Sequence, residues 1–542
     1  MTPPPRSSSF QRHWPRWVML AVLVFVAALR LQMMNFPLER DEGEYAYAGQ
    51  LLLQGIPPYE LAYNMKFPGT YLAYAAIMAP FGETPAGIHF GLLLLTTATA
   101  LMVFWLGKKM LDETAGVVAA TSYATLAIST GMLGYSAHAT HFCAFFATLG
   151  LCCLWSGWSH KKLSILAAAG FCFGLAILMK QHAALLALWA GIVLTVTAFI
   201  KNETSRARRL AAVAGFAVSV ILPFGLCCLW LWHAGVFEKF WFWTIQYGQA
   251  YVSLTQPGEA LGHLNWSLRA IVSDCYLWWL AVLGLVVIWF DSRLRSLRIG
   301  FLGLCLASAL TTAPGFYFRT HYFLLLLPAA ALLAGCAISG GAHWLRQRPR
   351  AAKFAKIPAV IFALLLIFTL YTYTGVASVL TRFGGHALYG MEPVPESQAV
   401  AAFIRANSKP DARIAVLGSE PQIYFYSRRH SATGYIYIYG LMEPQPFALK
   451  MQHEMMAEIQ TNQPEYIIYS NVDSSWQRRA DSDPTIFNWW ANYKTGYELV
   501  GIAELNSLLE TTYLWNEDAA HHGPLKNVGL EIYRRKPATP AN

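Results

Sequence analysis

A short charged run follows the first apolar segment of the chain, Glu39-Arg40-Asp41-Glu42-Gly43-Glu44-Tyr45. A second motif, Lys66-Phe67-Pro68-Gly69-Thr70-Tyr71, comes soon after it. Most of the surrounding chain is apolar, and ionisable side chains at membrane depth are costly and usually functional. We therefore interpret the charged run as a catalytic loop.

Part of this run also has a structural explanation. Asp41-Glu42-Gly43-Glu44 fits a capping box, with Asp41 as the N-cap of a helix and Glu44 at its third position. Glu42 would then favour the positive end of the same helix. A cap does not require the neighbouring charges at Glu39 and Arg40, and capping does not exclude catalysis. We therefore favour a functional role.

The composition indicates which elements must hold these residues. Of the 542 residues, 56% are hydrophobic and 13% are charged, whereas about 25% are charged in a typical soluble domain. Apolar runs of roughly 20 residues, the length that crosses a bilayer, recur from Trp17 to about Leu380. We predict a polytopic α-helical membrane protein with about eleven spans, at 17–34, 87–107, 114–132, 139–158, 163–180, 182–200, 209–232, 271–290, 297–313, 321–342 and 357–380.

The basic residues predict the orientation of these spans. Lys and Arg concentrate before the first span and in alternate loops, on the side that the positive-inside rule makes cytoplasmic. This assigns a cytoplasmic tail to 1–16, a transmembrane domain to 17–389 with an outer loop at 35–86, and a soluble extracytoplasmic α/β domain to 390–542. The net charge of +10 is explained by the loops and does not indicate nucleic acid.

Two local features of the membrane part are interpreted structurally. Tyr45 to Gln54 and Pro68 to Pro80 have the pattern of amphipathic helices that lie in the membrane interface, and the aromatic loop 233–269 has the same character. The 9 cysteines fall between Cys143 and Cys336 and lack the spacing of a zinc or disulfide framework. We interpret them as small apolar residues.

Several cationic residues gather on the predicted outer side. Lys66 could merely reach the lipid headgroups. His138 and His141, three residues apart at the start of a span, are more simply polar helix-end residues than metal ligands. Lys180-Gln181-His182 and Arg319-Thr320-His321 interrupt apolar runs on this same side. A cationic cluster away from the cytoplasm suggests an anionic ligand, such as the phosphate of a lipid carrier.

The region after Gly390 alternates between helical and strand patterns, which suggests a small α/β domain. It contains no phosphate-binding glycine motif. The expected helices are Pro395 to Ala406 and Pro446 to Gln460, and the expected strands are Arg413 to Leu417, Gln422 to Tyr426, Tyr435 to Tyr439, Tyr466 to Tyr469 and Glu531 to Tyr533.

Taken together, these motifs resemble those of the GT-C glycosyltransferases, in particular the protein O-mannosyltransferase and aminoarabinose transferase group. The most specific element is the run from Arg40 to Tyr45. Lys66-Phe67-Pro68 is similar to the Lys-Pro-Pro element of the aminoarabinose transferases, with Phe67 in place of the first proline. Arg319-Thr320-His321-Tyr322-Phe323 looks like the late outer-loop motif of the family. Where the family often has an acidic residue near the fourth span, this chain has only histidines.

The resemblance implies an enzyme that moves a hexosyl or pentosyl sugar from a polyprenyl-phosphate donor to a lipid, glycan or protein acceptor at the outer face of the membrane. Asp41 would be the general base of an inverting attack, with Glu42 as the second candidate. The implied donor phosphate contacts are Arg40, Lys66, Lys180, Arg319 and His321. The implied acceptor or secondary contacts are Tyr45, His138, His141 and Tyr322. No cofactor or metal ligand is assigned, and a divalent metal is left open.

Two functions of other classes compete with this interpretation. A multi-span transporter or lipid flippase would have charges near the bilayer midplane and internal repeats, and the sequence indicates neither. A membrane-anchored binding protein would not need eleven spans. We expect the C-terminal domain to bind the acceptor or to pack over the catalytic loop. The expected location is a bacterial inner membrane, with membrane lipids as further partners and a role in glycosylation of the cell envelope.

Overall fold

The structure is a computed structural model that describes residues 9–201, 204–522 and 525–537. Its contacts divide the chain into two compact units. Unit 1 comprises Met1–Met34, His89–Leu226 and Pro257–Ala377, and unit 2 comprises Asn35–Ile88, Cys227–Gln256 and Ser378–Asn542. Residues 1–8 of the predicted cytoplasmic tail lie outside the described residues.

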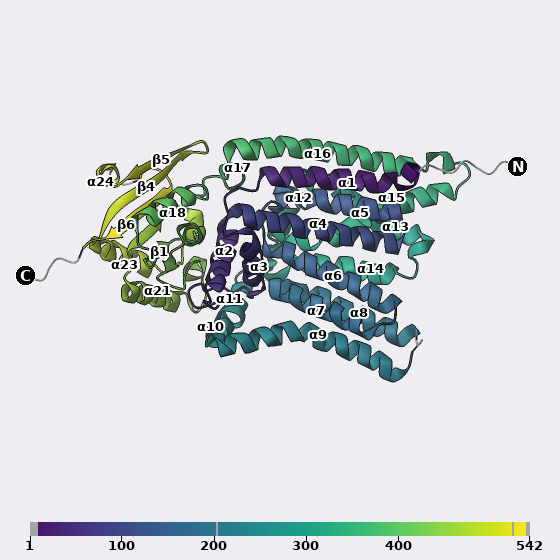
Figure 1. Cartoon of the computed structure of the whole chain (residues 1–542), viewed down its shortest axis with the longest axis horizontal. Helices are drawn as coiled ribbons and strands as arrows, with labels where there is room; N and C mark the ends of the chain where they lie inside the picture. The colour runs from purple at the N-terminus through teal and green to yellow at the C-terminus, as the bar shows by residue number, and fades with distance from the viewer. Residues whose placement is uncertain (1–8, 202–203, 523–524, 538–542) are drawn as a thin grey trace, which may run out of the picture. The chain divides into compact units, whose positions relative to one another are not determined.

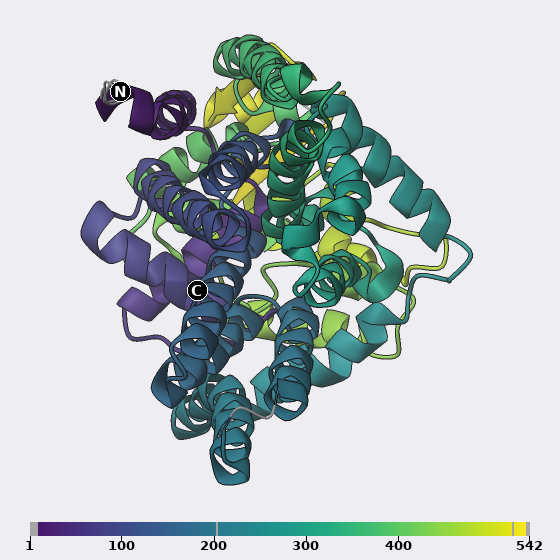
Figure 2. The ribbon, with the colours of Figure 1, turned by 90° about the vertical axis from the view of Figure 1, so that its right-hand side faces the viewer.

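Unit 1 is built from long helices that run side by side (Figures 1 and 2). Those that lie wholly or largely in it are α1 (Ser9–Gln32), α4 (Pro85–Met110), α5 (Glu113–Leu126), α6 (Ala139–Ser159), α7 (Leu163–Met179), α8 (Ala184–Lys201), α9 (Arg206–His233), α12 (Ala260–Asp274), α13 (Trp278–Phe290), α14 (Arg298–Leu310), α15 (Leu327–Arg346) and α16 (Ile357–Phe383). Short 3₁₀ turns connect them at Thr130–Met132, Gln181–Ala183, Ser292–Leu294, Pro314–Phe316, Thr320–Leu325 and Ala352–Phe354.

Six helices among the described residues are long and apolar enough to cross a membrane, and the number is seven if a bent pair, Ala260–Ser273 and Trp278–Phe290, forms one span. The six are Pro15–Gln32, Pro85–Met110, Ala139–Ser159, Gln181–Ile200, Arg206–His233 and Ala352–Phe383. Each predicted span coincides with a helix or with this pair. The polytopic helical fold is therefore confirmed, whereas the count of eleven spans stays a prediction.

Helix α15 shows how the bundle packs. It is rich in alanine and glycine, and most of its length is buried. A side chain at Gly335 would bring its Cβ to 2.5 Å from the carbonyl oxygen of Ala115 on α5, so the two helices pack at backbone distance. Small residues commonly permit such close approach between membrane helices. All nine cysteines are free and lie among the described residues, and six of them are buried.

Unit 2 contains one mixed sheet of six strands in the order β2-β1-β3-β6-β4-β5. Strands β2 and β3 pair parallel to β1, and the remaining pairs are antiparallel. The strands are β1 (Arg413–Leu417), β2 (His430–Ser431), β3 (Tyr466–Ser470), β4 (Tyr497–Ser507), β5 (Glu510–Trp515) and β6 (Gly529–Arg535). The predicted α/β domain is confirmed.

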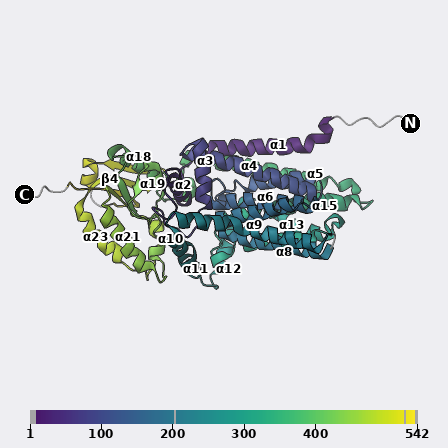
Figure 3. The same ribbon diagram turned by 60° about the horizontal axis from the view of Figure 1, so that its bottom comes forward.

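The helices of unit 2 come from three stretches of the chain. They are α2 (Arg40–Leu53), α3 (Gly69–Phe81), α10 (Phe237–Trp241), α11 (Gly248–Val252), α17 (His386–Tyr389), α18 (Glu396–Asn407), α19 (Gln422–Ser427), α20 (Tyr439–Met442), α21 (Ala448–Asn462), α22 (Asp473–Trp476), α23 (Thr485–Tyr493) and α24 (Glu517–His522), with a π-helical turn at Phe242–Tyr247 and a 3₁₀ turn at Lys494–Gly496. Helices α21 and α23 lie next to each other (Figure 3).

Two strands predicted in this region are wrong. Gln422 to Tyr426 forms helix α19, because it follows Pro421 and its apolar side chains are buried on both sides of the chain. Tyr435 to Ile438 is irregular, and Tyr439 begins the short helix α20. Strands β4 and β5 form an antiparallel hairpin that the sequence did not indicate.

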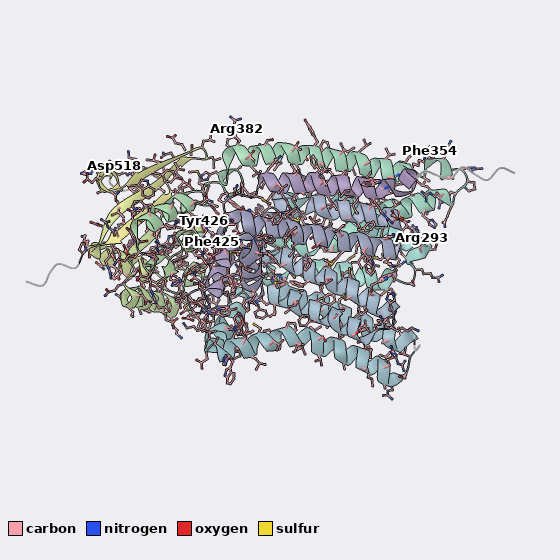
Figure 4. The ribbon with its side chains drawn as sticks, in the orientation of Figure 1. Arg293, Phe354, Arg382, Phe425, Tyr426 and Asp518 are labelled. Carbon is pink, nitrogen blue, oxygen red and sulfur yellow. The ribbon has the colours of Figure 1, made fainter. Side chains whose placement is uncertain are left out.

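Helix α2 packs against α3 and α19 within unit 2. Residues from Glu42 to Leu51 are buried without a break. The prediction of an amphipathic helix with one face in the membrane interface is therefore wrong for α2. Tyr426 of α19 (labelled in Figure 4) accepts a hydrogen bond from the backbone amide of Leu38 at 2.8 Å. The charged run therefore packs on the C-terminal domain. Packing over the catalytic loop was one of the two sequence-based expectations for that domain.

Candidate functional site

The first turn of α2 positions the charged run. The helix begins at Arg40 and not at Tyr45, and its N-cap is Glu39. The carboxylate of Glu39 accepts hydrogen bonds from the backbone amides of Asp41 and Glu42, both at 2.9 Å. The Glu42 carboxylate accepts one in return from the backbone amide of Glu39 at 3.4 Å, which completes the capping box.

The predicted capping box of Asp41 and Glu44 is therefore wrong in register. Glu39 takes the cap because its extended backbone precedes the first helical residue. The shift matters chemically, since the carboxylates of Asp41 and Glu44 then lie three residues apart on one face of the helix. Both face the same partner, Lys66.

Lys66 joins the two carboxylates. Its ammonium lies 2.8 Å from Oδ1 of Asp41 and 2.5 Å from Oε2 of Glu44. The hydroxyl of Tyr71 donates to Oε1 of Glu44 at 2.6 Å. The ring of Tyr45 lies beneath the ammonium, which is 4.5 Å from the ring centroid. Favourable cation–π contact adds to the charge pairing here.

The two carboxylates differ in exposure. The side chain of Asp41 is 25% exposed, whereas that of Glu44 is 1% exposed. Burial raises the pKa of Glu44, and the nearby Lys66, which lowers it, does not fully compensate. Burial alone would lower the pKa of Lys66, but the two carboxylates hold this pKa well above its usual value. Lys66 is thus a fixed cation, and Asp41 is the more accessible carboxylate of the pair.

The C-terminal domain contributes directly to this cluster. The hydroxyl of Tyr437 donates to Oδ1 of Asp41 at 3.0 Å. The guanidinium of Arg40 lies 2.8 Å from the buried Oε1 of Glu420 and 3.2 Å from Oε1 of Glu392. The Arg40 side chain is buried, and its guanidinium is occupied by these carboxylates. The contact of Arg40 with a donor phosphate stays a prediction.

A second cluster of predicted residues lies in unit 1. The ammonium of Lys180 sits 4.0 Å from the centroid of the Tyr322 ring. The ring of His321 packs edge-on against Tyr322 at 4.8 Å and stacks on His138 at 4.4 Å. His182, which the sequence analysis did not assign to the site, also packs edge-on against Tyr322. Residues from three separate segments thus meet around His321 and Tyr322.

The other predicted residues of unit 1, His141 and Arg319, lie close in the chain to members of this second cluster. His138 is the N-cap residue of α6, and His141 lies in its first turn, as expected of polar helix-end residues. The guanidinium of Arg319 lies over the ring of Tyr317, 5.4 Å from its centroid. The predicted site residues therefore form two clusters, one in each unit.

Some contributors were missed at the sequence level. Glu44 and Tyr71 stand within the quoted motifs, and the spacing of Asp41 and Glu44 was a usable signal. Tyr437 and Glu420 carried no signal, because they are nearly 400 residues away in the chain. Arg30 was also missed, although a lone arginine in an apolar span is unusual. It is buried and donates to the carbonyl oxygens of Ala127 and Gly134, in the segment before α6.

Comparison with known proteins gives a family-model match to part of the chain and structural matches to nearly all of it. The family model described as dolichyl-phosphate-mannose-protein mannosyltransferase matches residues 66–227, which is less than half of the chain. No curated protein sequence matches the chain.

Solved structures match over nearly the whole chain. ArnT from Cupriavidus metallidurans, bound to undecaprenyl phosphate, is 16% identical with a TM-score of 0.61, covering 96% of this chain and 98% of that one. The oligosaccharyltransferase of Archaeoglobus fulgidus, tethered with an acceptor peptide, is 14% identical with a TM-score of 0.56, covering 94% and 75%. A structure of the same archaeal enzyme, AglB, with an inhibitory peptide and a dolichol-phosphate is 13% identical with a TM-score of 0.54, covering 94% and 75%.

Proposed function

We propose that this chain, which has the fold of the GT-C membrane glycosyltransferases, transfers a sugar from a polyprenyl-phosphate donor to an acceptor hydroxyl or amine at the outer face of the membrane. Its structural neighbours bind undecaprenyl phosphate and dolichol-phosphate. The observation that carries the proposal is the partly exposed carboxylate of Asp41, whose Oδ1 accepts hydrogen bonds from both Lys66 and Tyr437.

Asp41 is the general base of the proposed reaction. Its carboxylate takes the proton of the acceptor as the acceptor oxygen or nitrogen bonds to the anomeric carbon. The bond from that carbon to the phosphate oxygen breaks at the same time, and the bonding electrons leave with the polyprenyl phosphate. Attack from the face opposite the phosphate inverts the anomeric centre.

Asp41 is a better base than Glu42 on this structure. The Glu42 side chain is buried, with 1% of its surface exposed, and its carboxylate belongs to the capping box of α2. Lys66 stabilises the charged form of Asp41, and Tyr437 orients the carboxylate through Oδ1. A general base must come within hydrogen-bond reach of the proton that it takes, which favours the exposed group.

The cluster around Tyr322 is the proposed phosphate-binding element. Lys180 supplies a positive charge and His321 a ring nitrogen, and both are oriented by contact with the same tyrosine. Preorganised cations stabilise the charge that develops on a leaving phosphate. Arg319, three residues before Tyr322, adds a second cation in the same segment. No nucleotide site is needed, because the donor is already activated on its lipid.

The experiment that tests this function uses the purified full chain in vesicles with sugar-labelled donors. Transfer from a polyprenyl-phosphate sugar to a lipid, glycan or peptide acceptor is expected, with no transfer from nucleotide sugars. NMR of the product would give the anomeric configuration, and inversion is expected. Movement of lipid or solute across the vesicle with no donor consumed would replace this proposal with a transporter.

A further inference from the structure

Arg40, in the first turn of α2, forms a buried ion pair with the C-terminal domain. Arg40 donates from Nε and Nη2 to the same carboxylate oxygen of Glu420, at 3.2 and 2.8 Å. The Glu420 side chain is fully buried, with 0% exposed. Further acceptors around the guanidinium are Glu392, the hydroxyl of Tyr439, and the carbonyl and hydroxyl of Ser474.

The residues that bind the Arg40 side chain lie where the parallel strands of the sheet end. Glu420 follows β1 by three residues, and Ser474 lies shortly after β3, which is the parallel neighbour of β1. The turn is tight, because Gly418 has a φ of 145° and a Cβ there would lie 2.6 Å from Cβ of Ser470. In α/β sheets the carboxyl ends of parallel strands are where ligands usually bind. Here that edge holds the side chain of Arg40.

A second contact fixes α2 against the same segment. A Cβ at Gly43 would lie 2.5 Å from Cβ of Gln422, so the α2 backbone touches the start of α19 directly. The amide of Gln422 in turn donates to the other oxygen of Glu420 at 2.7 Å. Asp41 stands between Arg40 and Gly43 in the sequence. The segment 420–422 therefore holds the chain on both sides of Asp41.

We propose that Glu420 is a positioning residue for Asp41, acting through Arg40, an inference that rests on the proposed function. Removal of one partner from a buried ion pair leaves an uncompensated charge. Without Glu420 the guanidinium must move or draw in water, and the first turn of α2 moves with it. Displacements of about 1 Å at a reacting group can lower rates by roughly a hundredfold.

The test compares Glu420→Gln with Glu396→Gln. Glu396 is an equally buried carboxylate of the C-terminal domain whose partners are His386 and Thr511, outside the α2 contact. We expect Glu420→Gln to lower kcat about ten- to a hundredfold with little change in the donor KM, and Glu396→Gln to keep kcat within about twofold at a comparable Tm. Wild-type kcat in Glu420→Gln would overturn the inference.

A double variant separates positioning from general damage. In Asp41→Asn the base is already lost, so adding Glu420→Gln should lower the residual rate no further. A full multiplicative loss would contradict action through Asp41. If Asp41→Asn itself keeps wild-type transfer, the proposed function fails at its base, and this result is distinct from failure of the Glu420 inference alone.

Glu420→Asp covers the case in which Glu420→Gln does not fold. This variant keeps the buried negative charge but withdraws the carboxylate by one methylene. If Glu420 only balances charge, Glu420→Asp retains the wild-type kcat, and the inference is overturned. If it sets the place of α2, kcat falls while Tm and donor binding are retained, which is the result that we expect.

Discussion

The ammonium of Lys66 lies 2.8 Å from Oδ1 of Asp41, and the same nitrogen lies 2.5 Å from the buried Oε2 of Glu44. One cation thus serves two carboxylates on one face of α2. Lys66 holds Oδ1 of Asp41 in place, and Glu44 holds Lys66. This three-residue arrangement explains why the two charged motifs of the sequence act as one element.

Lys66→Met should abolish most of the transfer. The carboxylates of Asp41 and Glu44 would then lack their common cation, and the negative charge of Asp41 would raise the pKa of Glu44 further. We expect kcat to fall about a hundredfold or more, measured as labelled product with saturating donor. Lys450→Met is the matched control, because Lys450 is exposed, pairs with Glu454 one helical turn away and lies over the ring of Phe242, outside the Lys66 cluster. Equal activity in both variants would contradict the role of Lys66.

Glu44 should make stability depend on pH. Because burial raises the pKa of Glu44, the folded state holds a proton there that the unfolded state has lost. Stability therefore falls as pH rises from about 4.5, the ordinary value for this group, through the raised pKa.

The measurement is Tm against pH in detergent for wild type and Glu44→Gln. The variant should lose less stability than wild type across that window, since a glutamine side chain does not titrate. Glu60→Gln, an exposed carboxylate of the same loop, controls for a change of net charge and should follow the wild type. If the curves of Tm against pH were parallel for wild type and Glu44→Gln, the pH dependence would not come from Glu44 and the prediction would be wrong.

The C-terminal domain should affect catalysis through Tyr437. Tyr437→Phe removes the hydroxyl that donates to Asp41 at 3.0 Å, and a hydrogen bond to a charged group contributes about 1.5–3 kcal/mol. We expect kcat to fall about tenfold or more, with donor KM unchanged. Tyr435→Phe is the control, because its hydroxyl donates to Glu454 instead. A larger loss in Tyr435→Phe would argue against a direct effect on Asp41.

Lys180 should act on donor binding. Lys180→Met removes the ammonium over Tyr322, so the KM for the polyprenyl-phosphate sugar should rise about tenfold with a smaller fall in kcat. Lys162→Met is the matched control, because Lys162 and Lys180 flank the two ends of α7. If both variants raise the donor KM equally, the effect is general and the phosphate site is not at Lys180.

The membrane helices could be predicted from the sequence because apolar length is a strong signal. Each predicted span coincides with a helix or a helix pair. The order of residues within the first turn of α2 could not be predicted. Asp is a preferred N-cap residue and Glu is not, so the cap at Glu39 follows from the backbone conformation of that segment and not from residue type.

Tertiary context explains the other errors. Gln422 to Tyr426 has the residues of a strand, but it forms α19, which follows Pro421 and packs against α2 and α18. The contacts of Tyr437 with Asp41 and of Glu420 with Arg40 join distant parts of the chain. No periodicity in one sequence reports such pairs, so the residues through which the C-terminal domain contacts the first turn of α2 were visible only in the structure.

Transfer by Asp41→Asn measured beside donor binding is the most direct test of the central claim. The substitution keeps the size of the side chain and removes its ability to take a proton, and Glu60→Gln serves as the control. We predict loss of at least about a hundredfold in single-turnover transfer, with labelled polyprenyl-phosphate sugar bound as in wild type. Wild-type turnover in Asp41→Asn would contradict the assignment of Asp41 as the base.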